Sequence, residues 1–578
     1  MKKSLICLAA LLLAVIYASP CFSGGDKPDY VTELLARAKA DECYNGIGGD
    51  YIPGPDSEYG SDCASGQKPK ANQAYLWGLT KHEDNLWFGT AANMLCLMRA
   101  FNIYQQDGDA TAYENSLWAC EYDEGKYPDQ EMASPLPGEV FSDYRPPRIY
   151  TYDIENHELE DQTHKVSEPG ARMLLENTFG LRSAGSLDGV VFLAGPVALE
   201  EGINMFAFDA DTGKFLGAKT LEQYQNIRKW TVHNDVLYTA VADYETGGKV
   251  LRWTGSRENP FSFEEVGSLD GSGAEIVAHE GRLFVGTWPS RTLDEPTMAG
   301  IWMSPEIPDE GLDSGDSDNW QKVWQPDEYE PDPVNALLYG VGAMESFDGY
   351  LYWGTMHVHG KAALFFTQQN NISSAKLPQT YFNTWRATSI FRGKNFAQDR
   401  EVELLYGNRT MAVYKKTGDS SGYWTRRYNK MGGVRGKYGE SGFDNIYNNY
   451  AWTMEVYNGE LFVGTMDHSY LWLDWNNLQR AYIKGTYFTI PLPRIPLYYT
   501  PSEEEYGADL WRFPSSDSEA VRVSRDGMGN FVNYGIRSIL ADEDTGLYLG
   551  TASSANIHQD DDGNLEAGWE LLRISRTK

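Results

Sequence analysis

The stretch YNGELFVGT, Tyr457 to Thr465, recurs in modified form along the chain and decides the fold. The pair Asn458-Gly459 supplies the positive φ angles of a tight two-residue turn, and a β-rich aromatic strand follows it. The stretch therefore predicts a β-hairpin. Because self-similarity at a period of about 20 to 50 residues marks structural repeats, the recurrence also predicts a repeat architecture.

Eight copies of the hairpin can be aligned. Most are followed by a third strand, such as GIWMSP or ADLWRFP, and several continue into a turn and a fourth strand. Four-stranded units without amphipathic helices between them are typical of a β-propeller. We predict an all-β propeller of eight four-stranded blades, with seven as the alternative. The copies end at Thr90, Gly195, Ala240, Thr287, Thr355, Asn408, Thr465 and Thr551.

The last copy has a third strand, WELLRIS, but almost no chain after it. Its fourth strand must come from elsewhere, and the segment before Asn72 is the candidate. We therefore expect an N-terminal segment over 24–71 that closes the last blade, and a propeller over 72–578. Two long loop insertions, 91–147 and 484–507, interrupt the repeat and are placed where recognition loops commonly occur.

Residues 1–23 have the layout of a secretory signal peptide. Lys2 and Lys3 precede an apolar run, and the small and polar stretch ASPCFSGG follows it. The run is too short to span a bilayer, and no second one follows. We expect a protein of the periplasm, the cell surface or the extracellular space. Lipid anchoring at Cys21 is the alternative, although Pro20 before it fits such a site poorly.

Removal of the signal peptide leaves four cysteines, an even number in an oxidising compartment. Two disulfides are expected, and three connectivities are possible. Pairing of nearest neighbours would join Cys43 to Cys63 and Cys96 to Cys120. No Cys-x-x-Cys motif occurs, which disfavours a zinc ribbon, a thioredoxin-type redox site and covalent haem.

The formal net charge of −33 bears on partners. Such a surface repels nucleic acid and anionic lipid, so we predict no nucleic-acid binding. Calcium is possible: HQDDDGNLE, His558 to Glu566, resembles an acidic cation loop, although histidine replaces the first aspartate of the EF-hand pattern. A solvated acidic turn is the other interpretation. No other cofactor is identified, and no oligomeric state is predicted.

Arginine and tryptophan recur at one position of the repeat. In a propeller the first strand of each blade lines the axis, so we aligned the first strands by their turns and compared the residue seven positions earlier. That register holds Trp77, Arg182, Arg228, Ala274, Gly342, Arg386, Trp452 and Arg537.

Two interpretations of the four arginines compete. In the first, each arginine pairs with a buried carboxylate of a neighbouring blade. In the second, the arginines converge on the axis and bind a carboxylate, sulfate or uronic acid, while Trp77 and Trp452 stack on a sugar. The second interpretation defines the candidate ligand site.

A weaker candidate is a transition-metal site. In GTMHVHG, His357 and His359 would project from one face of a strand, because side chains alternate with period 2. A later copy reads GTMDHS, with Asp467 and His468. Imidazoles and a carboxylate could bind a metal. Loop histidines that are hydrogen-bonded to their surroundings are the other interpretation.

Three local motifs carry family resemblances. AFDADTGKFLG, Ala207 to Gly217, resembles the repeat signature of quinoprotein propellers, with glycine in place of the usual tryptophan. DSGDSDNWQKVW and GDSSGYW resemble decayed Asp-boxes of sialidase-like propellers. Taken whole, the chain from about Asn72 resembles secreted bacterial propeller proteins of unassigned function. These motifs describe turns and transfer no activity.

We therefore predict a secreted module that binds or scaffolds an anionic glycan, a small anion or a protein partner. A carbohydrate-active hydrolase or lyase using the arginine-rich axis is the alternative. A quinoprotein dehydrogenase ranks third, because a single unit carries that signature.

Overall fold

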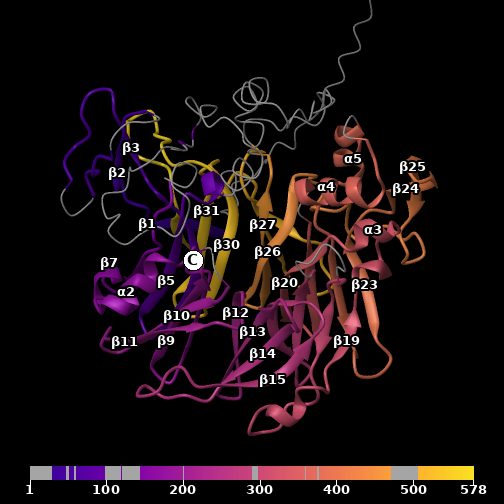
Figure 1. The fold of residues 1–578 in the computed structure, drawn as a ribbon, viewed down its shortest axis with the longest axis horizontal. Helices are drawn as coiled ribbons and strands as arrows, with labels where there is room; N and C mark the ends of the chain where they lie inside the picture. Colours follow the sequence, from indigo (N-terminus) through magenta and orange to yellow (C-terminus); the bar gives the residue numbers. More distant parts are fainter. Residues whose placement is uncertain are drawn as a thin grey trace, which may run out of the picture.

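The computed structural model describes residues 29–46, 51–56, 60–97, 117, 119, 143–198, 201–289, 297–357, 359–373, 376–469 and 505–577. Within this part the protein is nearly all β-sheet, built from units of four antiparallel strands (Figure 1). No helix here is long and apolar enough to cross a membrane.

Seven such units are formed by the described residues. The first unit consists of β4 (Gln73–His82), β5 (Asn85–Ala92), β6 (Ile149–Asp153) and β7 (Glu158–Asp161), and the second of β8 (Ser183–Leu187), β9 (Val190–Pro196), β10 (Ile203–Asp209) and β11 (Phe215–Leu221). The third unit consists of β12 (Asn226–His233), β13 (Val236–Asp243), β14 (Gly247–Trp253) and β15 (Phe263–Leu269), and the fourth of β16 (Ser272–His279), β17 (Arg282–Trp288), β18 (Ile301–Met303) and β19 (Gln321–Trp324).

The remaining three units complete the set. The fifth unit consists of β20 (Tyr339–Phe347), β21 (Tyr350–His357), β22 (Ile390–Lys394) and β23 (Glu401–Tyr406), and the sixth of β26 (Asn448–Tyr457), β27 (Glu460–Asp467), β28 (Leu510–Phe513) and β29 (Val521–Ser524). The seventh unit consists of β30 (Asn533–Asp542), β31 (Gly546–Ser553), β32 (Glu570–Arg576) and β1 (Tyr30–Arg37).

The seven units form a ring. Each first strand contacts the first strand of the next unit, in the order β4, β8, β12, β16, β20, β26, β30 and back to β4. In the seventh unit, β1 pairs antiparallel with β32, from Tyr30 opposite Arg576 to Arg37 opposite Glu570. The N-terminal strand thus supplies the strand that the last repeat lacks, and the arrangement is that of a β-propeller.

The predicted eighth unit does not form in the described residues. Its hairpin ending at Asn408 is instead β22 and β23, the outer strands of the fifth unit. Its expected third strand, MAVYKK, belongs to β24 (Thr410–Gly418), which pairs with β25 (Ser421–Tyr428) as a separate hairpin. This copy lacks a turn pair of the Asn-Gly type. Without such a turn pair, the sequence of a first hairpin cannot be told apart from that of any other antiparallel strand pair.

The predicted tight turns are confirmed in the backbone. Asn458 and Gly459 have φ angles of 51° and 69°, and Asp348 and Gly349 have 49° and 76°. Positive φ at both turn positions matches the right-handed twist of the flanking strands. The repeated pairs therefore fix where each first strand ends, and with it the register of the axis.

Aromatic side chains fill the space between adjacent sheets. Phe192 of the second unit stacks on Trp230 of the third, with ring centroids 5.5 Å apart. Gly185 permits this approach, because a Cβ there would lie 2.6 Å from the Trp230 ring. Trp353 and Phe391 stack in the same way inside the fifth unit, at 5.5 Å. Large buried rings thus hold the second sheet to the third and pack within the fifth.

Short helices, 3-10 turns and a small sheet lie outside the seven four-stranded units. They include the helices α2 (Pro169–Glu176), α3 (Pro333–Ala336), α4 (His359–Gln369) and α5 (Leu377–Thr384), with 3-10 turns η3 (Thr163–Lys165), η4 (Ser314–Asp316) and η5 (Pro326–Glu328). A small two-stranded sheet joins β2 (Glu42–Tyr44) and β3 (Lys68–Lys70). Figure 1 shows α4 and α5 grouped beside the β24–β25 hairpin.

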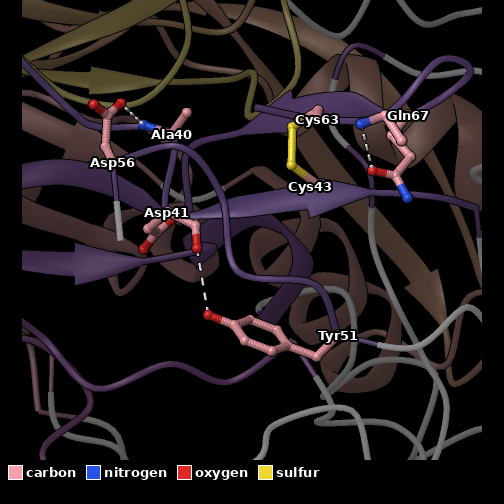
Figure 2. Close-up of a disulfide and its surroundings, with 8 residues drawn as sticks. Ala40, Asp41, Cys43, Tyr51, Asp56, Cys63 and Gln67 are labelled. Carbon is pink, nitrogen blue, oxygen red and sulfur yellow. Dashed lines mark hydrogen bonds between the residues drawn. A yellow bond between two sulfur atoms is a disulfide. The ribbon is translucent and has the colours of Figure 1, made fainter. Parts of the chain in front are cut away.

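A disulfide between Cys43 and Cys63 staples the N-terminal segment (Figure 2). Around it, the Ala40 amide donates to Asp56 at 2.9 Å and the Tyr51 hydroxyl donates to the Asp41 carbonyl at 3.3 Å. This connection is the one expected from nearest-neighbour pairing. Cys96 is also disulfide-bonded, and Cys120, its predicted partner, lies outside the described residues.

Candidate anion site on the propeller axis

The predicted register coincides with a β-bulge in six of the seven first strands. In β4 the pairing shifts across Trp77, in β12 across Arg228 and Lys229, and in β30 across Arg537. A bulge leaves its extra residue unpaired and re-aims the side chain. The other three first strands carry the shift at Ala274, Gly342 and Trp452.

Five of the six predicted ligand residues line one cavity on the axis. They are Trp77, Arg182, Arg228, Trp452 and Arg537, and the cavity measures about 290 Å³. From these residues it continues along the first strands toward their hairpins, where half-buried Leu79, Thr231 and Leu540 line it. The inner end is therefore lined by cationic and aromatic side chains, and the outer end by both apolar and polar ones.

Arg228 is the best-anchored arginine of the inner end. Its Nε lies 2.6 Å from Glu275 Oε1, and its Nη2 donates to the carbonyls of Gly342 at 2.8 Å and Trp452 at 2.7 Å. Burial lowers its pKa, while Glu275 acts in the opposite direction. Arg228 thus ties three neighbouring bulges together and still has Nη1 without a hydrogen-bond partner in the described structure.

Arg537 differs, because it is buried without a counter-ion among the described residues. It is 5% exposed, and its Nε and Nη2 have no hydrogen-bond partner there. Its guanidinium lies over the rings of Trp77 and Trp452, 5.9 and 5.5 Å from their centroids. Burial, followed by the charges of Arg228 and Arg182, holds its pKa well below the usual value.

Arg182 completes the inner end from the segment just before β8. It donates from Nη1 to Asn226 Oδ1 at 2.7 Å, and its guanidinium carbon lies 5.2 Å from the Trp77 ring and 4.9 Å from the Trp288 ring. Three guanidiniums therefore share the inner end, where Glu275 forms an ion pair with Arg228.

A second charged layer lies next to the first. Lys229 Nζ lies 3.3 Å from Glu345 Oε2, and Glu345 together with Glu275 and Glu455 raises the lysine pKa against the effect of burial. Burial, reinforced by Glu345, raises the pKa of Glu455 to about 8. Glu455 is therefore protonated at neutral pH.

Sequence reasoning missed Lys229, Glu275, Glu455 and Trp288. The first two directly follow register positions, Arg228 and Ala274, in the same bulges. A bulge turns two consecutive side chains toward one side. Reading two residues at each register position, rather than one, would have found them.

Arg386 does not line the cavity. Its Nε and Nη2 bind the two oxygens of Glu330 at 2.7 and 3.1 Å, and Nη1 donates to the carbonyls of Asn383 and Trp385. Glu330 outweighs burial and raises the arginine pKa. Arg386 follows α5 instead of lying in a first strand, because the described residues form no eighth unit. It fits the buried-pair interpretation of the arginines.

The histidines do not form the expected strand pair. His357 ends β21, whereas His359 begins α4, so the two do not share one face of a strand. His357 is buried, its Nε2 lies 3.1 Å from the Asn335 side chain, and burial together with Arg386 holds its pKa well below the usual value. It is therefore a neutral member of the network around Arg386.

Asp467 and His468 occupy the end of β27. Asp467 accepts from Asn445 Nδ2 at 2.8 Å and from the Ser469 amide at 2.6 Å. Burial lowers the pKa of His468 to about 4, and its ring contacts the rings of Trp385 and Tyr450. Metal binding by these residues stays a prediction.

One other set of side chains has metal-like spacing in the described residues: His82, Glu83 and Asp211. Asp211 is already paired with Arg257 and with His82, which favours a plain ion-pair cluster. The loop at His558 to Glu566 is an exposed turn in which Asp560 accepts from the amides of Asp562 and Asn564. Calcium binding there stays a prediction.

Comparison with known proteins gives structural likeness alone. No family model and no curated protein matches the chain. The polysaccharide lyase Uly1 aligns with a TM-score of 0.36 and 8% identity, over 95% of this chain and 99% of that one. The β-propeller domain of the Trilobed protease from Pyrococcus furiosus aligns with a TM-score of 0.33 and 8% identity, over 84% and 94%.

Proposed function

We propose that the protein is a secreted binding module that holds an anionic group of a glycan, a small anion or a protein partner in the axial cavity. The observation that carries the proposal is Arg537, a buried guanidinium on the axis without a carboxylate partner in the described structure. The Cys43–Cys63 disulfide fits an oxidising compartment outside the cytoplasm.

The electrostatics of the inner end favour an anion. A buried charge is costly unless it is paired, and of the two buried arginines Arg228 pairs with Glu275, whereas Arg537 has no carboxylate partner among the described residues. Buried rings such as Trp77 and Trp452 surround them, and a low local dielectric strengthens attraction to an incoming anion. A carboxylate, sulfate or phosphate would supply the acceptors that the unused N–H groups lack.

The size of the cavity limits the occupant. About 290 Å³ corresponds to roughly ten water molecules at their bulk volume. This is near the lower end of small-molecule sites. The cavity therefore suits an inorganic anion or a single acidic sugar, or an acidic group that projects from a larger partner.

A screen of thermal stability against sulfate, phosphate, acetate, glucuronate and galacturonate tests the proposal. An anion that binds the folded protein raises the free energy of unfolding, by about 2.7 kcal/mol at a concentration of 100 Kd. Titration calorimetry then compares the wild type with Arg537→Gln. We expect binding to fall by roughly 1 to 3 kcal/mol for each lost charge-assisted hydrogen bond.

The matched control is Arg522→Gln. Arg522 is exposed on β29 and lies outside the cavity lining. The Arg522→Gln substitution removes the same charge as Arg537→Gln and should leave the affinity for the anion unchanged. Equal loss of affinity in both variants, or an absence of binding by every anion in the screen, would contradict the proposal.

A carbohydrate-active hydrolase or lyase is the second candidate, and Glu455 favours it. A carboxyl group with a pKa of about 8 is protonated at neutral pH, which is the state required of a general acid. If the protein is an enzyme, an acidic oligosaccharide that binds should also be cleaved. Glu455→Gln should then abolish cleavage while binding persists. Binding of the oligosaccharide without its cleavage would favour the binding module over the enzyme.

A further inference from the structure

A strongly basic segment interrupts this acidic chain. Between Leu404 and Gly439 there are eight lysines and arginines and one acid, Asp419, in a protein with a formal net charge of −33. All eight cations are exposed, and none forms an ion pair within the part of the chain that the structure describes. We call β24, β25 and the loop that follows to Lys437 the basic ribbon.

One face of the basic ribbon is turned outward toward the hairpin tip, whereas Met411, on the same face at the other end, is buried. Tyr414 and Trp424 are opposite each other, and both rings pack on Phe366 of α4, with centroids 5.8 and 4.9 Å away. Because successive side chains of a strand point to opposite faces, Lys415, Tyr423 and Arg427 lie on the other face. Figure 1 shows β24 and β25 at the outer edge of the molecule, beside α4.

Exposed tyrosines on the ribbon lie beside cations. Lys415 Nζ lies 5.9 Å from the Tyr423 ring centroid, and Tyr423 is 51% exposed. Arg409 lies 5.2 Å from the ring of Tyr428, which is 62% exposed. A ring and a cation together match an acidic sugar, whose apolar face packs on the ring while its carboxylate or sulfate binds the cation.

The cations are also spaced for a polymer. Lys415 is opposite Tyr423, and Arg427 is opposite Met411, four positions further along the ribbon. At the rise of an antiparallel strand this separation is about 13 Å. A small anion could neutralise one of these cations at a time, whereas a chain with repeated charges could bind both.

We propose that the basic ribbon binds a linear anionic polysaccharide, such as a polyuronate or a sulfated glycan. The hairpin tip, Thr417 to Ser421, is polar and contains Asp419, so it offers no apolar side chain for insertion into a bilayer. The acidic remainder of the surface repels a polyanion and confines it to the ribbon. The inference does not depend on the axial site.

Titration calorimetry of the full mature protein with polygalacturonate tests the inference, with neutral dextran as the reference polymer. We expect binding that weakens as salt is raised and strengthens from the dimer of galacturonate to longer oligomers. The double variant Lys415→Gln/Arg427→Gln should lose affinity by about tenfold or more. The matched control, Lys214→Gln/Lys219→Gln, removes the same charge from exposed positions around β11 and should bind as the wild type does.

Other results would overturn the inference. Polyglutamate binding without polygalacturonate binding would assign the ribbon to an acidic protein. Self-association that is lost in the ribbon variant would assign it to a second copy of this chain, and binding to phosphatidylglycerol vesicles alone would assign it to a membrane. Equal affinities of the ribbon and control variants for polygalacturonate would also refute it. Arg537→Gln should leave ribbon binding intact, which separates this test from that of the axial site.

Discussion

Arg228 and Glu275 form an ion pair of 2.6 Å between the bulges of two neighbouring first strands, β12 and β16. The pair lies next to Arg182 and Arg537 on the axis of the ring. Arg228 therefore has a carboxylate partner, whereas the buried Arg537 beside it has none among the described residues. This imbalance is the physical basis of the proposed anion site.

Replacing Glu275 by glutamine should destabilise the protein. The change leaves the buried Arg228 without its carboxylate, next to the buried Arg537, and breaking a buried pair typically costs about 3 to 5 kcal/mol. Urea denaturation measures the loss, and sulfate should restore part of it by binding the guanidiniums of Arg228 and Arg537. Glu310→Gln, at an exposed position, is the control. Equal stability of the two variants would contradict this view of the axis.

Arg386→Met should be strongly destabilising for a different reason. The change leaves Glu330 buried, with its two oxygens deprived of Arg386. We expect a cost of about 3 to 5 kcal/mol in the free energy of unfolding. The double variant Arg386→Met/Glu330→Gln should cost less than the sum of the single changes, because it removes both charges. An additive result would rule out a coupled pair.

The buried carboxylates at the end of the sixth unit predict a pH dependence. Burial, with Asp509 beside it, raises the pKa of Asp467 to about 7, and burial raises the pKa of Asp509 to about 6. The folded protein thus holds these protons more tightly than the unfolded chain, where an aspartate titrates near about 3.9. Their contribution to stability is complete below about pH 4 and is lost as the pH rises toward about 7.

Asp467→Asn isolates this effect. The amide cannot ionise, so the variant should lose less stability than the wild type between about pH 5 and pH 7.5. Urea denaturation at both pH values measures the difference. Asp318→Asn, on an exposed turn, should keep the wild-type dependence. If Asp467→Asn also keeps it, the raised pKa is wrong.

Closure of the ring by β1 can be tested by deletion. A mature chain lacking residues 24–37 loses β1, which exposes the edge of β32. It also loses the buried Tyr30, whose hydroxyl donates to Glu460 at 2.6 Å. We expect a much lower melting temperature. A chain lacking only residues 24–28 retains β1 and is the control. Equal melting temperatures would show that β1 does not stabilise the ring.

The local sequence pattern was sufficient to predict the repeated hairpins and the register of residues that face the axis. Pairs such as Asn458-Gly459 fix the turn, and counting back from the turn reached the bulge residues Trp77, Arg228 and Arg537. The described residues form seven units, which was the alternative count, and not the preferred eight, because β22 and β23 give the alternating pattern of a first hairpin. Which pair of strands faces the axis depends on contacts between distant units.

Charge partners could not be predicted from the sequence for the same reason. Glu330 is 56 residues from Arg386, and Glu275 is on a different unit from Arg228, so neither pair has a local signature. The same register position therefore holds a structural arginine in one place and an unbalanced one in another. The basic ribbon was overlooked because the overall charge of −33 masks one cationic segment.

The most direct test of the axial site is the anomalous diffraction of crystals soaked in selenate, an analogue of sulfate that identifies the bound atom. Our account predicts a selenium peak in the axial cavity, with selenate oxygens within hydrogen-bonding distance of Arg537 Nε and Nη2. The peak should be absent from Arg537→Gln crystals and present in Arg522→Gln crystals. A cavity that holds water alone at saturating selenate, or a protein carboxylate already paired with Arg537, would contradict the account.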